Sequence, residues 1–212
     1  MQRAKTSTIW MENKMAQVNE VSIFSYSFSD IVKTAYSLVL TKIFYRGARL
    51  VRRPISILGK KNFNFGKGFT TGKNCRIEIF PGGSLKTGKN CRIGDNVHIV
   101  ASNKVVLGEE CLLASHIFIS DTSHGTYSGD EQDSPDVPPN YRSLTSDSVV
   151  IGNNVWIGEN VCILPGSEIG FSSIIGSNSV VTGKIPNQSI AVGSPAKVSK
   201  QFNTNTGEWT RV

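Results

Sequence analysis

Residues 151–181 read IGNNVWIGENVCILPGSEIGFSSIIGSNSVV, with an aliphatic side chain at every sixth position. An α-helix repeats about every 3.6 residues and a half-buried strand every 2, so neither explains this spacing. A period of six is typical of a parallel β-helix built from hexapeptides. The periodic positions are Ile151, Ile157, Ile163, Ile169, Ile175 and Val181.

In such a fold each hexapeptide forms one short strand and a turn, and three hexapeptides form one triangular coil. We expect the aliphatic residue to point into the prism, with the smaller residue two positions earlier packed beside it. Glycine or asparagine is expected at the corners, where positive φ angles are tolerated. Successive coils then stack about 4.8 Å apart, so that strands pair with the coils above and below.

The same spacing, in steps of six or eight, extends back to Phe65 and gives fifteen core positions, or about five coils. The step from Ile119 to Ile151 is 32 residues where a step of six would continue the coil, so a long loop leaves the prism. Long loops on rigid scaffolds are commonly functional. We predict an all-β protein with an N-terminal segment (1–58), a β-helix (59–192) with a protruding loop (120–148), and a C-terminal tail (193–212).

Residues 28–53 carry apolar side chains at helical spacing, with Ser29 or Asp30 as candidate cap and Pro54 as the stop signal. A cationic row on one side of such a helix suits an anionic membrane surface. We favour packing of this basic amphipathic helix against the prism or a neighbouring subunit, and keep peripheral membrane contact as the alternative. The cationic row consists of Lys42, Arg46, Arg49 and Arg53.

The net charge of +7 is unevenly distributed along the chain. Residues 1–73 hold 13 Lys or Arg and 3 Asp or Glu, a net of +10, whereas the remainder holds 10 and 13, a net of −3. Nucleic acid is not expected as a partner, because the basic segment matches no known binding motif and lacks stacking residues interleaved on a sheet.

Three of the four cysteines precede a core aliphatic residue by two positions, which predicts buried thiols and a reducing compartment. The chain shows no signal-peptide pattern and no run of 18 apolar residues. We therefore expect a cytoplasmic protein, with contact to the inner face of the membrane as the alternative. The three cysteines are Cys75, Cys91 and Cys111.

The histidines give no metal-binding pattern within one chain. If Leu113 stacks on Ile93, then His98 lies under Phe118 and His116 lies over Asn96, so the two histidines do not meet. We expect no metal site from this arrangement.

His124 stands at the start of the long loop, in the sequence DTSHG with Asp121. A histidine beside a carboxylate is the pair that a general base requires. A loop histidine without a catalytic role is the alternative that the residues alone leave open.

Five segments carry a resemblance that covers two thirds of the chain: DTSHG (121–125), PDVPPNYR (135–142), VVIGNNVWIGENVCILPG (149–166), IIGSNSVVTGKIP (174–186) and AVGSPAKV (191–198). They resemble the hexapeptide-repeat acetyltransferases, and within these the sugar O-acetyltransferases of the maltose, galactoside, capsule and O-antigen groups. The resemblance implies a left-handed parallel β-helix and a homotrimer with active sites between adjacent prisms. It also implies acetyl-CoA as the donor and direct transfer to a hydroxyl.

The resemblance also implies roles for single residues. His124 matches the catalytic histidine, and Asp121 is expected to orient its imidazole. Trp156 matches the tryptophan that walls the acyl and acceptor pocket. The backbone amides near Glu159 and Ser177 match those that bind the thioester and the pantetheine arm, where such donors stabilise an oxyanion.

The donor's nucleotide end has matches nearer the C-terminus. Thr182 and Lys184 match pantetheine and phosphate contacts, and Lys197 and Lys200 stand where the family carries cations against the 3′-phosphate. Lysine can serve there as a point charge. Gly183 departs from the family's frequent lysine, which removes one donor contact.

The expected function is therefore O-acetylation of a sugar in surface polysaccharide assembly. Three alternatives stay open: N-acetylation of an amino sugar, a non-catalytic trimeric scaffold, and a zinc enzyme of the γ-class carbonic anhydrase type. The last needs histidines five residues apart, whereas His116 and His124 are eight apart.

Overall fold

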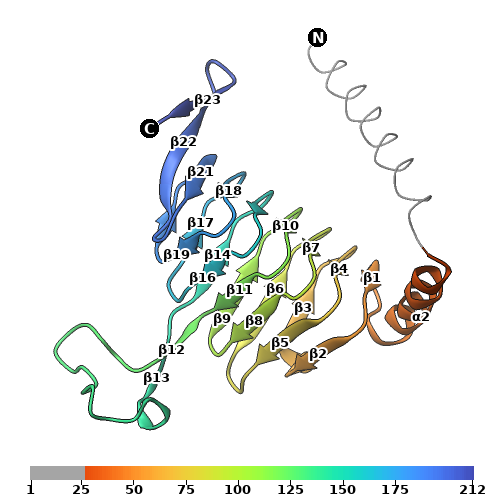
Figure 1. Cartoon of the computed structure of the whole chain (residues 1–212), viewed down its shortest axis with the longest axis horizontal. Helices are drawn as coiled ribbons and strands as arrows, with labels where there is room; N and C mark the ends of the chain where they lie inside the picture. The colour runs from red at the N-terminus through yellow and green to blue at the C-terminus, as the bar shows by residue number, and fades with distance from the viewer. Residues whose placement is uncertain (1–26) are drawn as a thin grey trace.

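The structure is a computed structural model that describes residues 27–212. It is a three-sided prism of parallel strands, with one helix at its N-terminal end and a long loop leaving its side (Figure 1). We name the three sheets faces A, B and C, because the chain visits them in that order in every coil. The parallel β-helix predicted from the period of six is confirmed.

Faces B and C contain six strands each, and face A continues beyond them, which makes six complete coils. Face A is formed by β1 (Leu50–Val51), β4 (Thr70–Thr71), β7 (Arg92–Ile93), β10 (Leu112–Leu113), β15 (Trp156–Ile157), β18 (Ile174–Ile175) and β21 (Ser189–Val192). Face B is formed by β2 (Ile55–Leu58), β5 (Cys75–Ile79), β8 (His98–Ala101), β11 (Phe118–Ser120), β16 (Cys162–Ile163) and β19 (Val180–Val181). Face C is formed by β3 (Phe63–Phe65), β6 (Ser84–Thr87), β9 (Lys104–Leu107), β14 (Val149–Ile151), β17 (Glu168–Ile169) and β20 (Lys184–Ile185).

The first coil begins at β1, nine residues before the expected boundary at residue 59, so there are six coils rather than about five. Val51, Ile57 and Phe63 are themselves six apart and belong to this coil. Their strands pair with the second coil, with Val51 opposite Thr71 and Ile57 opposite Ile77.

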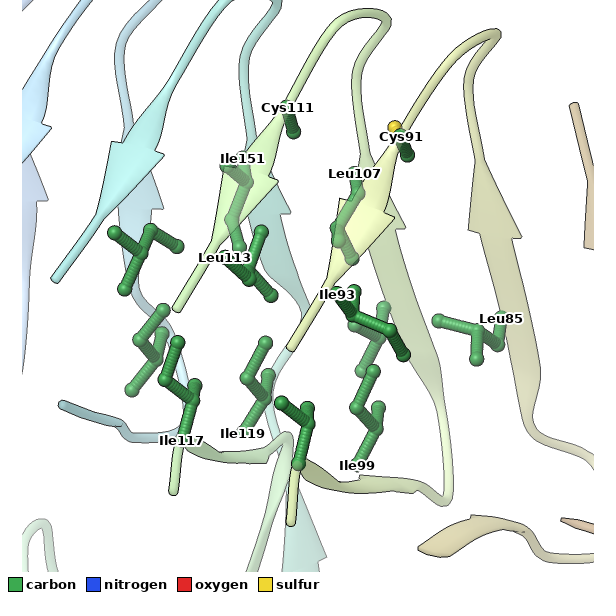
Figure 2. Close-up of a cluster of buried hydrophobic side chains, with 14 of the residues drawn as sticks. Leu85, Cys91, Ile93, Ile99, Leu107, Cys111, Leu113, Ile117, Ile119 and Ile151 are labelled. Atoms are coloured by element: carbon green, nitrogen blue, oxygen red, sulfur yellow. The ribbon is translucent and has the colours of Figure 1, made fainter. Parts of the chain in front are cut away.

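The core is a stack of inward aliphatic side chains held in register (Figure 2). Leu113 pairs with Ile93 and Ile119 pairs with Ile99, as the spacing predicted. Each fully buried aliphatic side chain contributes about 1.5–3 kcal/mol relative to exposure. The cysteines predicted to be buried are buried, and desolvation raises the pKa of the Cys75 thiol to about 11.

Asparagine and glycine have different tasks at the corners. Asn160 and Asn178 adopt positive φ angles of 58° and 60°. The glycine that follows a core aliphatic residue instead allows close stacking, because a Cβ at Gly158 would lie 2.7 Å from the Ser177 nitrogen. The expectation of glycine or asparagine at these corners is confirmed by Gly166, at φ 77°, and by the asparagines, which hold most of the left-handed corners in residues 151–181.

Helix α2 (Phe28–Phe44) is capped by Ser27, whose hydroxyl accepts a hydrogen bond from the Asp30 amide at 3.2 Å. The cap is thus Ser27 rather than Ser29 or Asp30, and the helix ends well before Pro54. It packs on the prism through buried Thr41, whose hydroxyl accepts from the Val51 amide at 2.9 Å. No helix within residues 27–212 combines the length and apolarity needed to cross a bilayer.

The tail forms strand β22 (Lys197–Asn203), which pairs antiparallel with β21, and strand β23 (Glu208–Arg211), which pairs antiparallel with β22. The C-terminal tail predicted for residues 193–212 is thus a β-hairpin. Two short 3₁₀ helices are η1 (Lys60–Asn62), between β2 and β3, and η2 (Pro139–Tyr141), in the long loop.

Candidate functional site

The long loop leaves the prism at the corner between faces B and C and returns to it (Figure 1). Its two ends meet where the Asp147 amide donates to the Asp121 carbonyl at 2.8 Å. Beyond that point β12 (Thr122–His124) pairs antiparallel with β13 (Leu144–Ser146). His124 therefore lies on a two-stranded stalk fixed to the prism.

Arg142, two residues before β13, links the segments of the loop that lie beyond the stalk. Its Nε donates to the Val137 carbonyl at 2.8 Å, and its Nη1 donates to the Tyr127 hydroxyl at 2.9 Å. The Tyr127 hydroxyl in turn donates to the His124 carbonyl. The backbone of His124 is thereby positioned, while its side chain stays exposed.

Asp121 is fully buried and turns toward the prism. Its carboxylate accepts hydrogen bonds from the Ser102, Asn103 and Lys104 amides at 2.7–2.8 Å, and from the Thr122 hydroxyl at 2.8 Å. No hydrogen bond joins it to His124 in the described part of the chain. The expectation that Asp121 orients the imidazole is therefore corrected, because both of its oxygens bind the neighbouring corner.

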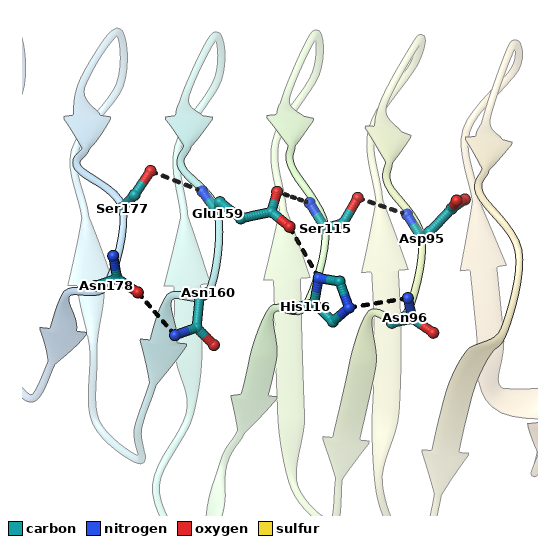
Figure 3. A network of polar contacts seen from close by, with 8 residues as sticks. All are labelled: Asp95, Asn96, Ser115, His116, Glu159, Asn160, Ser177 and Asn178. Carbon is teal, nitrogen blue, oxygen red and sulfur yellow. Dashed lines mark hydrogen bonds and ion pairs between the residues drawn. The ribbon is translucent and has the colours of Figure 1, made fainter.

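A row of polar side chains runs along the corner between faces A and B, and we call it the A/B ladder (Figure 3). The amide of each corner residue donates to a side chain of the next coil. Asp95 donates to Ser115 Oγ at 3.1 Å, Ser115 donates to Glu159 Oε2 at 2.9 Å, and Glu159 donates to Ser177 Oγ at 3.1 Å. The backbone amide of Lys73 begins the ladder by donating to Asp95 Oδ1.

His116 joins this ladder rather than a metal site. Its Nδ1 lies 2.8 Å from Glu159 Oε1 and its Nε2 lies 3.1 Å from the side-chain Nδ2 of Asn96 (Figure 3). The hydrogen bond from His116, followed by that from the Ser115 amide, holds the pKa of Glu159 below its usual value. The predicted placement of His116 over Asn96 is confirmed, and residues 27–212 contain no cluster of three or more metal-ligating side chains.

The two backbone amides expected at the donor site differ in availability. The Glu159 amide already donates to Ser177 Oγ within the chain. The Ser177 amide comes at the end of the A/B ladder, and no described residue accepts a hydrogen bond from it.

Trp156 lies on face A with its indole half exposed. Beside it the C-terminal hairpin places Phe202 and Trp209, whose ring centroids are 5.3 Å apart at 64°. Together they line a hollow, which we call the aromatic hollow, and no charged side chain lines it. Its lining is Asn154, Trp156, Ser172, Ile174, Gln188, Phe202 and Trp209.

The sequence did not point to Phe202 or Trp209, because the tail lacks the six-residue period. Phe202 on β22 lies opposite Trp209 on β23. A predicted hairpin over residues 197–211 would have placed the two side by side. One aromatic residue on each side of the turn-forming segment TNTG (204–207) was the available signal.

The remaining predicted residues are dispersed. Thr182 lies at the B/C corner, and Lys184 on face C forms an exposed ion pair with Glu168 at 3.0 Å. Such pairs contribute little stability, so the ammonium can rearrange at small cost. Lys197 and Lys200 are exposed on β22 beside face A.

The predicted site residues thus occupy two separate edges of one prism. His124 stands at the B/C corner, whereas Ser177 lies at the A/B corner, and face B separates the two corners. A single chain does not bring the imidazole to the corner amide.

The sequence of residues 148–183 matches the family model "Bacterial transferase hexapeptide (six repeats)". The chain is 39% identical over 187 residues to "Putative lipopolysaccharide biosynthesis O-acetyl transferase WbbJ" of Escherichia coli K12. This match covers 88% of the chain and 95% of that relative.

Two solved structures place the fold among acyltransferases. A galactoside acetyltransferase in complex with coenzyme A is 33% identical, with a TM-score of 0.51, covering 65% of this chain and 67% of that one. The N-acyltransferase AntD of Bacillus cereus, in complex with dTDP and 3-hydroxybutyryl-CoA, has a TM-score of 0.63 and covers 79% of this chain and 89% of its own. At 19% identity AntD shows likeness of fold alone.

Proposed function

Because the chain belongs to the hexapeptide-repeat acetyltransferases, we propose that it transfers acetyl from acetyl-CoA to a sugar hydroxyl in surface polysaccharide assembly. The observation that carries this proposal is the position of His124: an exposed imidazole on a positioned stalk, in a chain with an O-acetyl transferase relative over most of its length.

In the proposed reaction the His124 imidazole removes the proton of the acceptor hydroxyl as its oxygen attacks the thioester carbonyl carbon. The carbon–sulfur bond then breaks, the acetyl ester remains on the acceptor, and coenzyme A leaves as a thiolate that takes the proton. General base catalysis of this kind contributes about 10²–10⁴ in rate. No covalent enzyme intermediate is needed.

The site is proposed to form between two copies of the chain. A threefold arrangement that brings the B/C corner of one prism to the A/B corner of the next also turns face B of every prism toward the axis. Outward residues of face B in the later coils are apolar, which suits a buried contact: Phe118, Cys162 and Val180. Face C, with the Glu168–Lys184 ion pair, then faces outward.

The donor acetyl-CoA is proposed to lie between two such copies. The free Ser177 amide would bind the pantetheine arm at the A/B corner. Thr182 and Lys184 of the neighbouring B/C corner, with Lys197 and Lys200, would serve the pantetheine and phosphate groups. Exposed lysines bind phosphate as point charges.

The acceptor is proposed to lie against Trp156 and the aromatic hollow. Aromatic ring faces beside neutral amide and hydroxyl groups suit a ligand with apolar ring faces and many hydroxyls, which describes a sugar. Asn154 donates to Ser172 Oγ at 3.2 Å and keeps its carbonyl oxygen for a ligand hydroxyl.

The deciding experiment offers the purified protein acetyl-CoA with a panel of hexoses, amino sugars and cell-surface glycans. Mass spectrometry of the products should find an acetyl ester on a sugar hydroxyl, with release of the coenzyme A thiol. An acetyl amide on an amino sugar would instead favour N-acetylation. No transfer to any acceptor, together with no thermal protection by acetyl-CoA, would favour a non-catalytic trimer.

A further inference from the structure

Helix α2 turns its polar side toward the prism and its apolar side outward. The side that contacts the prism carries the small polar residues Ser37 and Thr41, which are 3% and 0% exposed. The opposite side carries large apolar residues that stay largely exposed. These are Phe28, Ile31, Val32, Tyr36, Leu38, Val39 and Ile43, each at least 40% exposed.

Exposing these apolar side chains to water raises the free energy of the protein unless another surface covers them. Soluble helices ordinarily turn their apolar side to the core and their polar side to solvent. Here the polar side is bound internally, because the Thr41 hydroxyl donates to the Ser37 carbonyl at 2.6 Å and accepts from the Val51 amide. The helix is therefore fixed with its apolar side outward.

Positive charge surrounds the same end of the molecule. Residues 27–73 hold ten Lys or Arg and one acidic residue, Asp30. Among residues 27–212 none of these ten cations forms an ion pair. Arg46 and Arg49, directly after the helix, are exposed.

We propose that α2 docks the protein on an anionic lipid surface, its apolar side inserted and the surrounding cations against the headgroups. An outward apolar side bordered by uncompensated cations is the combination that an anionic bilayer surface binds. The helix lies at the end of the prism opposite the C-terminal hairpin, so docking leaves the sides of the prism free (Figure 1). The proposal does not depend on the chemistry assigned to His124.

The test is flotation of the full-length protein with vesicles of phosphatidylcholine alone or mixed with phosphatidylglycerol. The wild-type protein should float with the anionic vesicles, and rising salt should weaken this binding. Val32→Asp/Val39→Asp should lower binding at least about ten-fold, since it places carboxylates on the inserted side. Val150→Asp/Phe171→Asp, which alters exposed residues elsewhere on the prism, should bind like the wild type.

A second pair of variants tests the charge. Arg46→Gln/Arg49→Gln should lower binding roughly 25-fold, because each cation near the surface contributes about a five-fold factor. Lys86→Gln/Lys104→Gln on face C should leave binding unchanged. Failure of the wild type to float would overturn the proposal. So would unchanged flotation of Val32→Asp/Val39→Asp, or a change in oligomeric state in that variant, which would assign α2 to contacts between copies.

Discussion

Asp121 and His124 lie three residues apart at the root of one stalk, yet the Asp121 carboxylate points into the prism while the His124 imidazole is exposed. Asp121 accepts four hydrogen bonds from the prism corner and from Thr122, so its task is to fix the stalk. The two residues should therefore respond differently to substitution.

His124→Ala should lower acetyl transfer by at least about 10², because the acceptor hydroxyl loses its proton acceptor. The melting temperature should stay at the wild-type value, since no described residue bonds to this side chain. Turnover near the wild-type rate would remove His124 from the chemistry.

Asp121→Ala should lower the free energy of unfolding by about 1–3 kcal/mol, because the amides of the 102–104 corner lose their acceptor. Thermal denaturation measures this effect. Asp121→Asn, which keeps one acceptor oxygen, should lose less. Unchanged stability in Asp121→Ala, combined with a shifted pH profile of turnover, would return the residue to the catalytic role.

Cys162→Arg should dissociate the proposed trimer, because it places a cation on face B where the copies would meet. Val150→Arg is the matched control, since Val150 points outward from face C. Light scattering should find monomers of the first variant and trimers of the second. The opposite result would exchange the roles of the two faces.

Trp209→Ala should raise the KM for the sugar acceptor roughly ten-fold, because it removes one wall of the aromatic hollow. The KM for acetyl-CoA should not change. Phe171→Ala removes an exposed aromatic outside this hollow and should leave both constants as they are. Equal loss of affinity for donor and acceptor would show that the hollow does not select the sugar.

Glu78 makes stability depend on pH in the acid range. Arg76 Nη2 donates to its carboxylate at 2.7 Å and His98 lies 2.8 Å away, and these contacts, Arg76 first, hold its pKa below 4.5. The unfolded chain then binds more protons between that depressed pKa and 4.5, so the stabilisation is complete above 4.5 and disappears as the pH falls. The melting temperatures of wild type and Glu78→Gln should converge in acid; a constant difference down to pH 2 would refute this.

The periodic part of the molecule was predictable because the side of a strand and its neighbours follow directly from the spacing. Leu113 opposite Ile93 and His116 over Asn96 are consequences of counting residues. The buried cysteines follow for the same reason.

Other features depend on which neighbour a side chain meets, and spacing does not determine this. DTSHG places Asp121 near His124 in sequence, but the free amides of residues 102–104 attract the carboxylate more strongly. Helical spacing in α2 identifies an apolar side without fixing which way it faces. The aperiodic tail conceals the pairing of Phe202 with Trp209.

The reversal of chain direction at β22 limits how far this architecture can grow. Identical coils could in principle be added without end, either by the same chain or by the first coil of another molecule. β22 covers the edge of β21 with an antiparallel partner, and at the other end α2 binds β1. The last strands of faces B and C, β19 and β20, are only two residues long. The prism is thereby protected from polymerising end to end.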